Sequence, residues 1–156
     1  MAKVGGEAVS FETAGDGFVI SDDPGRFDLL QAHRWISEQS YWAEGIPLAT
    51  FEKAVRNSLC FGAYAVGGTM AGMGRVVTDR ATFGWLCDVF VDEAWRGRGL
   101  GKALMAYVKA HPDLQGLRRL HLATADAHGL YAAYGFGPLT TPDRWMEIKD
   151  PDVYRR

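Results

Sequence analysis

The chain has 156 residues, enough for one domain whose hydrophobic core closes without a disulfide or a metal. Its formal net charge is -2, which excludes the strongly basic surface of a typical nucleic-acid-binding protein. The first residues lack the apolar core of a secretory signal, and no apolar run approaches the ~20 residues of a membrane helix. We therefore expect a cytoplasmic protein with neither nucleic-acid nor membrane partners.

The two cysteines, Cys60 and Cys87, each lie inside an apolar run. Their separation matches neither the spacing of metal ligands nor a disulfide framework. We expect two buried thiols in a reducing compartment and no bound metal.

The N-terminal part of the chain predicts an arm, a strand and two helices. Residues 1–17 are rich in glycine and weakly patterned, so we expect a flexible arm ahead of a single domain over 18–156. A short strand over 18–22 ends at an Asp-Pro-Gly turn. The two helices are expected at 26–38, from apolar spacings of three and four, and at 47–57, where a proline begins the helix.

The remainder predicts an antiparallel meander followed by crossovers. Strands at 59–66 and 69–78 flank Gly67-Gly68, the signal of a two-residue hairpin. The further elements are a strand at 81–91, a helix at 99–110, a strand at 117–124, a short helix at 126–134 and a last strand at 144–149. This order predicts an α/β (α+β) fold.

A glycine-rich turn follows the strand that ends at Val91. Glycines at 97, 99 and 101 open a helix, and without Cβ atoms they let backbone N–H groups approach a ligand closely. The first N–H groups of a helix have no intrahelical partner, and the helix dipole adds positive potential there. The turn therefore suits a diphosphate. Its basic residues are Arg96, Arg98 and Lys102.

Two other kinds of phosphate loop do not fit. A Walker A loop needs Ser or Thr after its lysine, but Ala103 follows Lys102. A dinucleotide fingerprint needs G-x-G-x-x-G, and the run here is G-x-G-x-G. The alternative is a purely structural turn; because each glycine weakens a helix by up to ~1 kcal/mol relative to alanine, we expect a ligand to compensate.

The run R-G-R-G-L-G-K at 96–102, preceded by V-F-V at 89–91, resembles the acyl-CoA pyrophosphate loop of the GNAT N-acetyltransferase superfamily. The run Y-A-A-Y-G-F at 131–136 resembles that superfamily's second signature. The resemblance implies a mixed central sheet of six to seven strands with about four helices, and acyl-CoA in the cleft between splayed central strands. It also implies that acetyl-CoA donates an acetyl group to an amine, which attacks the thioester directly.

The resemblance further implies which residues contact coenzyme A. The Val89 N–H would face the thioester carbonyl and stabilise the developing oxyanion, and Val91 would hold the pantetheine. Thr124 stands where many relatives carry a coenzyme A-contacting asparagine. The full set of expected cofactor-binding residues is Val89, Phe90, Val91, Arg96, Gly97, Arg98, Gly99, Leu100, Gly101, Lys102 and Thr124.

Tyr131 matches the superfamily's usual general acid, which protonates the leaving thiolate; the alternative is a tyrosine packed on the core. The strand glutamate that serves some members as the base is replaced by Trp85. Asp88 is the second predicted catalytic residue, if a β-bulge re-aims it; its alternative role is an inward polar residue bonded to a loop. Further candidates for the base are Asp126, which also suits a helix N-cap, His128, Glu38 and Tyr41.

Acceptor specificity is expected from the loop over 39–46 and from nearby aromatic residues. The predicted substrate residues are Tyr41, Trp42 and Trp85, which with Phe83 and Trp145 would line a flat apolar slot. Such a slot favours an aromatic or hydrophobic amine; the alternative is that most of these side chains are core. We expect a small-molecule or peptide amine and leave a homodimer open. The alternative functions are a non-catalytic acyl-CoA-binding or sensor module and a protein-interaction domain.

Overall fold

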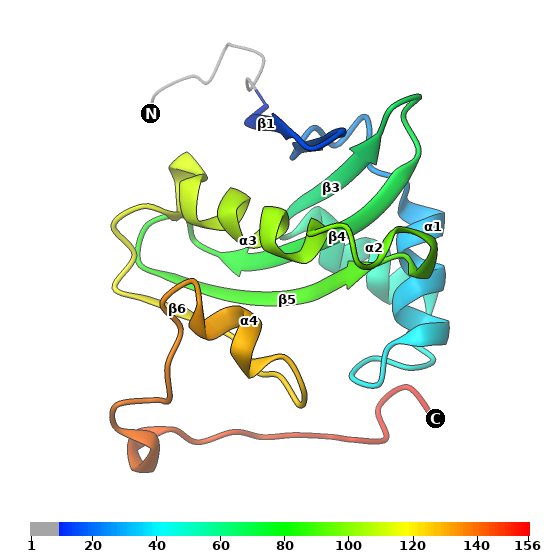
Figure 1. Ribbon diagram of the computed structural model, residues 1–156. Coiled ribbons are helices and arrows are strands. Elements are labelled where there is room, and N and C mark those ends of the chain that lie inside the picture. Colours follow the sequence, from blue (N-terminus) through cyan, green and yellow to red (C-terminus); the bar gives the residue numbers. More distant parts are fainter. Residues whose placement is uncertain (1–9) are drawn as a thin grey trace, which may run out of the picture.

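The computed structural model describes residues 10–156, which fold around one six-stranded mixed sheet (Figure 1). The strands lie side by side in chain order, and every neighbouring pair is antiparallel except the last, β5 with β6. The strands are β1 Glu12–Gly15, β2 Phe18–Ser21, β3 Leu59–Ala65, β4 Met70–Thr78, β5 Phe83–Val91 and β6 Arg119–His121. The predicted mixed sheet is confirmed.

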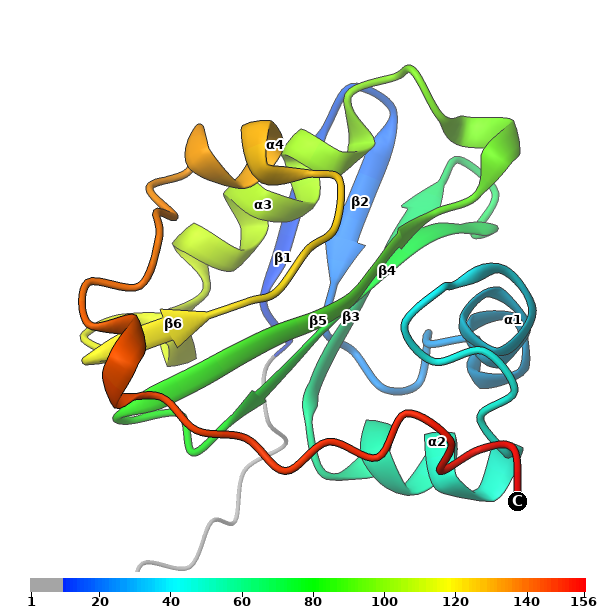
Figure 2. The same cartoon turned by 90° about the horizontal axis from the view of Figure 1, so that it is seen from below.

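Four α-helices cover the two faces of the sheet (Figures 1 and 2). They are α1 Leu29–Arg34, α2 Leu48–Arg56, α3 Leu100–Ala110 and α4 His128–Ala132. A π-helical turn, Trp35–Gln39, continues α1. Helices α1 and α2 lie on one face, and α3 and α4 lie on the other. None of the helices over residues 10–156 combines the length and hydropathy that a bilayer crossing requires.

Each face of the sheet has its own apolar core. Leu104 and Tyr107 of α3 pack with Phe61 and Val76 from the strands, and we call this group the α3 core. On the opposite face, Trp35, Ile36 and Phe51 pack with Met73 and Phe90, which together form the α1/α2 core. Side chains of a strand alternate between faces, so that the strands supply both cores.

The N-terminal strand corrects the predicted arm. Residues 12–15 were expected to be flexible, but they form β1, which pairs with β2 from Glu12 opposite Ser21 to Gly15 opposite Phe18. Asp16 and Gly17, with φ of 52° and 84°, make the tight turn between the two strands. Such a two-residue turn with both φ values positive favours Asp-Gly, and this hairpin signal was overlooked. The remainder of the expected arm includes residues 1–9, which lie outside the described part of the chain.

The predicted strand at 144–149 is wrong. Pro142–Arg144 forms a 3-10 turn, and the chain then runs as an irregular segment beneath β5 toward α2 (Figures 1 and 2). Met146 and Ile148 are 96% and 105% exposed. The alternating apolar residues that suggested a strand therefore have no neighbouring surface against which to pack. The observed sheet still has six strands, because β1, which was not predicted as a strand, compensates in number for the absent one.

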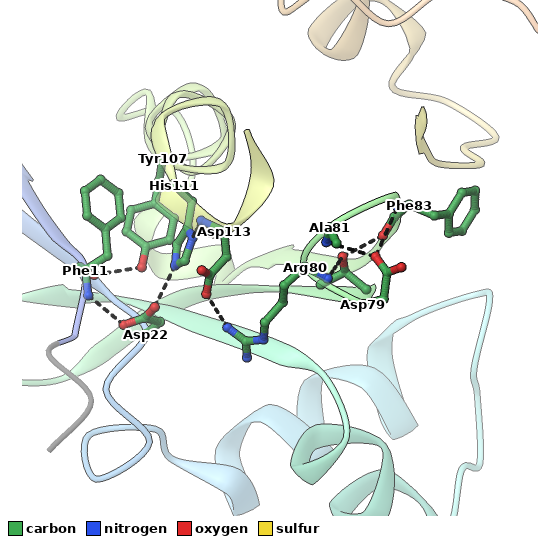
Figure 3. A network of polar contacts seen from close by, with 10 residues as sticks. Phe11, Asp22, Asp79, Arg80, Ala81, Phe83, Tyr107, His111 and Asp113 are labelled. Atoms are coloured by element: carbon green, nitrogen blue, oxygen red, sulfur yellow. Dashed lines mark hydrogen bonds and ion pairs between the residues drawn. The ribbon is translucent and has the colours of Figure 1, made fainter. Parts of the chain in front are cut away.

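A polar network fastens β1 and β2 to the end of α3 (Figure 3). The Asp22 carboxylate accepts from the Phe11 N–H at 2.9 Å and pairs with His111 Nε2 at 2.6 Å, while the Tyr107 hydroxyl donates to the Phe11 carbonyl at 2.8 Å. His111 Nδ1 accepts from the Asp113 N–H at 3.1 Å. Because Nδ1 acts as an acceptor, the ring proton lies on Nε2, and the imidazole donates it to Asp22.

Candidate active site

The parallel strands β5 and β6 separate soon after they pair. Their contacts join only Phe83–Trp85 to Arg119–His121, although β5 continues to Val91. Beyond Trp85, no strand formed by residues 10–156 therefore pairs with the backbone groups along this edge of β5. A cavity of about 400 Å³ occupies this opening and is lined from β5 by Leu86 to Val89 and from the β6 side by Leu122 to Thr124.

A β-bulge lies in β5 where the strand borders the cavity. Asp88 and Val89 together face Gly74 of β4, since the flanking pairs are Arg75 with Cys87 and Met73 with Phe90. Asp88 has a φ of 53°, in the left-handed region that a residue other than glycine rarely occupies. The bulge that the sequence analysis required to re-aim Asp88 is thus present.

The extra residue changes the face toward which later side chains of β5 point. Leu86, before the bulge, belongs to the α3 core, whereas Phe90, after it, belongs to the α1/α2 core. Val89 packs on the α3 side, and Asp88 lies on the other face with Arg75. Asp88 and Val89 are neighbours in β5, yet they line the cavity from opposite faces of the sheet.

The Asp88 carboxylate has a fixed donor on each oxygen. Arg75 Nε donates to Oδ2 at 2.8 Å, and Trp42 Nε1 donates to Oδ1 at 2.8 Å. Arg75 also donates from Nη1 to Ser58 Oγ at 2.9 Å. Asp88 is only 6% exposed, so this is a nearly buried ion pair whose members satisfy each other. The bond from Trp42 agrees with the alternative role of Asp88, an inward polar residue bonded to a loop, while its role as a base stays a prediction.

Tyr131, in α4, lines the cavity together with Val89. Its ring makes an edge-to-face contact with Phe136, with 6.0 Å between centroids. Burial, together with neighbouring Tyr41 and Asp126, raises the pKa of Tyr131 above its ordinary value. The phenol therefore keeps its proton at neutral pH, as a general acid must. The catalytic role of Tyr131 itself stays a prediction.

The glycine-rich turn forms a second hollow, of about 210 Å³, at the start of α3. Gly97 and Gly99 have φ of 78° and 77°, a conformation that glycine adopts without steric cost. Gly99 is the N-cap residue and supplies no side-chain cap; its carbonyl accepts the Ala103 N–H at 3.1 Å. The helical N–H groups before Ala103 therefore have no intrahelical acceptor and remain available to an anion.

Most of the predicted cofactor residues gather in these two hollows. The turn hollow is lined by Val91, Arg96, Gly97, Gly99, Leu100, Gly101 and Lys102, and the main cavity by Val89 and Thr124. Two of the predicted cofactor residues, Arg98 and Phe90, line neither hollow. Arg98 does not line the turn hollow and stacks over Trp95 at 4.8 Å, and Phe90 is buried in the α1/α2 core. Any contact that Phe90 makes with a cofactor must come from its main chain.

The predicted substrate residues Tyr41, Trp42 and Trp85 all line the main cavity, whereas Phe83 and Trp145 do not. The Tyr41 hydroxyl accepts from the Ala125 N–H at 2.9 Å, which ties the loop after α1 to the connection before α4. Among the further candidates for the base, Asp126 and Tyr41 line the cavity, and Glu38 and His128 do not.

Three cavity residues with polar side chains were missed by the sequence analysis. Arg75 could have been found, because a charge inside an apolar strand needs a partner. Cys87 was recognised only as a buried thiol; burial raises its pKa to about 12, so it stays protonated. Tyr154 comes from the C-terminal segment and had no local signal. No group of three or more His, Cys, Asp or Glu side chains within residues 10–156 is arranged to hold a metal.

Known proteins share this architecture. The model of the acetyltransferase (GNAT) family matches residues 28–136. A proposed acetyltransferase of Gibberella zeae, FG08082, is 31% identical, and the match covers 76% of this chain and 77% of that protein. The crystal structure of a proposed GNAT-family acetyltransferase from Xanthomonas campestris pv. campestris is 49% identical, with a TM-score of 0.86 over 89% of this chain and 97% of that one.

A more distant structure, Rv2747 of Mycobacterium tuberculosis in complex with CoA and NLQ, shares the fold at 24% identity. Its TM-score is 0.58, over 74% of this chain and 72% of that one. The separated strands, the bulge and the glycine-rich turn agree with the family match, which spans both sequence signatures. This chain belongs to the GNAT acetyltransferase family.

Proposed function

We propose that this protein is an N-acetyltransferase that moves an acetyl group from acetyl-CoA to a small-molecule or peptide amine. One observation carries the proposal. The edge of β5 that has no strand partner connects the two hollows, because Val91 lines the glycine-rich turn and Val89 lines the cavity that holds Tyr131. A diphosphate bound at the turn would thus continue into an arm that leads to the cavity.

Acetyl-CoA would supply the activated acetyl group, and this chain would bind and orient it. The free N–H groups at the start of α3, with Arg96 and Lys102 beside them, suit the diphosphate. The exposed edge of β5 suits the amide groups of pantetheine, which can pair with it like an added strand. The Val89 N–H would donate to the thioester oxygen as negative charge develops, worth a few kcal/mol in the transition state.

In the transfer step, the amine nitrogen forms a bond to the thioester carbonyl carbon, and the carbon–sulfur bond breaks. Tyr131 would give its proton to the departing thiolate, and the proton lost by the attacking nitrogen would return to solvent or to the phenolate. The raised pKa of Tyr131 favours this role because the phenol is protonated when the thiolate leaves. A covalent route through Cys87 is disfavoured, since a thiol of pKa about 12 supplies almost no nucleophilic thiolate at neutral pH.

Among the steps of the transfer, deprotonation of the acceptor amine is the one for which the cavity residues offer the weakest candidate. An alkylamine of pKa ~10.4 is neutral in about one molecule in 2,500 at pH 7, which costs ~4.6 kcal/mol. Both oxygens of Asp88 already accept hydrogen bonds, and Asp126 lies exposed at the rim. We therefore expect the rate with an alkylamine to rise with pH as more of the neutral amine becomes available.

Two measurements test the proposal. Calorimetry with acetyl-CoA should show saturable binding, and at 100 Kd the ligand should raise the free energy of unfolding by ~2.7 kcal/mol. Release of the coenzyme A thiol should then depend on added amine. Absence of heat with acetyl-CoA and with coenzyme A would refute the proposal; binding without amine-dependent thiol release would favour a non-catalytic acyl-CoA-binding module.

A further inference from the structure

We infer that the acceptor is a small amine with one positive charge and a flat aromatic body, held between Trp42 and Trp85. This inference rests on the proposed N-acetyltransferase function and names the class of its acceptor. The residues that carry it line the main cavity, where the amine would approach the thioester.

The first argument is the exposure of two indoles inside one cavity. Trp42 and Trp85 are 43% and 38% exposed, although Trp35 shows that this small domain can bury an indole to 1%. Trp42 is not a mobile surface side chain, because its Nε1 donates to Asp88. Aromatic faces that stay accessible in a concave site are suited to bind an apolar or aromatic ligand.

The second argument is the frame of chain segments around the cavity. Tyr41 bridges the loop after α1 to Ala125, so one side of the site is closed by a hydrogen bond between two segments. On another side, Tyr154 lines the cavity and its carbonyl lies against Gly45. A cavity of about 400 Å³ framed in this way admits a small molecule more readily than a lysine on a folded protein.

The third argument is the charge of the site. Arg75 and Asp88 pair with each other, which leaves exposed Asp126 as the remaining carboxylate among the lining residues. Among the lining residues that the structure describes, a second ammonium group would find no second anion, and an acceptor carboxylate would find only a guanidinium already bonded to Asp88 and Ser58. Electrostatics therefore favours an amine whose remaining body is uncharged.

The test compares 2-phenylethylamine with n-butylamine, two primary alkylamines that differ by the aromatic ring, and it refers each rate to the concentration of neutral amine because the phenyl group lowers the basicity. Thiol release with saturating acetyl-CoA should give 2-phenylethylamine a kcat/KM at least about tenfold higher, because the ring is buried against two indoles. Trp85→Ala should bring this ratio close to one, and Trp85→Phe should keep most of it. Trp145→Ala is the matched control, since Trp145 is also 38% exposed but does not line the cavity, and it should leave the ratio unchanged.

Several outcomes would overturn the inference. Equal kcat/KM for the two amines, a preference for spermidine or for a lysine peptide, or a ratio that survives Trp85→Ala would each contradict it while leaving N-acetyltransfer intact. Calorimetry on the same proteins separates the two proposals. Binding of acetyl-CoA without acetylation of either amine would overturn the inference, and no binding of acetyl-CoA would remove the proposed function and the inference together.

Discussion

Replacement of Gly101 by alanine should make the free protein more stable and its complex with acetyl-CoA weaker. Gly101 lies in the first turn of α3 with an ordinary helical φ, and a Cβ built there would meet Leu130 Cδ2 at 3.6 Å, a normal contact. Alanine therefore fits the free protein. Because glycine costs about 0.5–1 kcal/mol relative to alanine inside a helix, Gly101→Ala should raise the free energy of unfolding by that amount. The midpoint of thermal unfolding should rise by about 2–4 °C for 1 kcal/mol in a domain of this size.

The same methyl group should oppose the ligand. Gly101 lines the turn hollow, where a diphosphate must approach backbone N–H groups closely. Hydrogen bonds to a charged group contribute roughly 1.5–3 kcal/mol, so losing one should weaken acetyl-CoA binding on the order of 10- to 100-fold. Thermal unfolding and calorimetry on one preparation measure both effects.

Gly116→Ala provides the matched control for this experiment. A Cβ at Gly116 would meet nothing within 4 Å, but the φ of 70° disfavours alanine there, and Gly116 lines neither hollow. This variant should lose about 1–2 kcal/mol of stability and keep its affinity for acetyl-CoA. If Gly101→Ala is stabilised and binds acetyl-CoA as well as the wild-type protein, the glycine is not kept for the ligand, and the assigned diphosphate site is wrong.

Three further predictions concern the main cavity. Tyr131→Phe should lower kcat about 10²–10⁴-fold with unchanged calorimetric affinity for acetyl-CoA, whereas Tyr134→Phe, in the same segment, should change kcat little; equal effects would remove the acid role. Since the pKa of Tyr131 is raised, its protonated form persists to higher pH, and kcat at saturating amine should not fall until the pH exceeds the ordinary tyrosine value of about 10; a fall between pH 8 and 9 would contradict this. Asp88→Asn should lower the free energy of unfolding by about 3–5 kcal/mol in a denaturant titration, because it leaves Arg75 without its nearly buried partner, and a loss below about 1 kcal/mol would show that the pair is not stabilising.

The parts of the site that are local in sequence could be predicted from it. The glycine-rich turn consists of consecutive residues whose backbone forms the hollow, and Tyr131 follows it after one strand and its connections. Apolar runs and the Gly67-Gly68 hairpin signal also predicted the meander, because β3 and β4 bury nearly continuous runs of side chains. The Asp16-Gly17 hairpin carried an equally local signal, but the glycine-rich composition around it favoured an arm.

The walls of the cavity depend on contacts between distant segments, and these could not be predicted. Trp42 reaches Asp88 across 46 positions, and Tyr41 reaches Ala125 across 84. The segment after Arg144 was misjudged for a related reason. Alternating apolar residues at Met146 and Ile148 indicate a strand only if a partner strand is present, and β6 ends after three residues without pairing to them.

The bulge in β5 joins the donor and acceptor sides of the proposed site through one residue. In the proposed site the Val89 N–H would lie at the separated edge of the strand, while Asp88 turns to the other face and holds Trp42. Gly101→Ala should therefore weaken only the binding of acetyl-CoA, and Trp85→Ala should change only the preference among amines. Asp88→Asn should change the preference among amines and also lower kcat with every amine, because the carboxylate fixes the acceptor loop and the backbone next to the proposed oxyanion donor. A variant at Asp88 that alters amine preference while kcat with every amine stays normal would show that the bulge is held without this side chain.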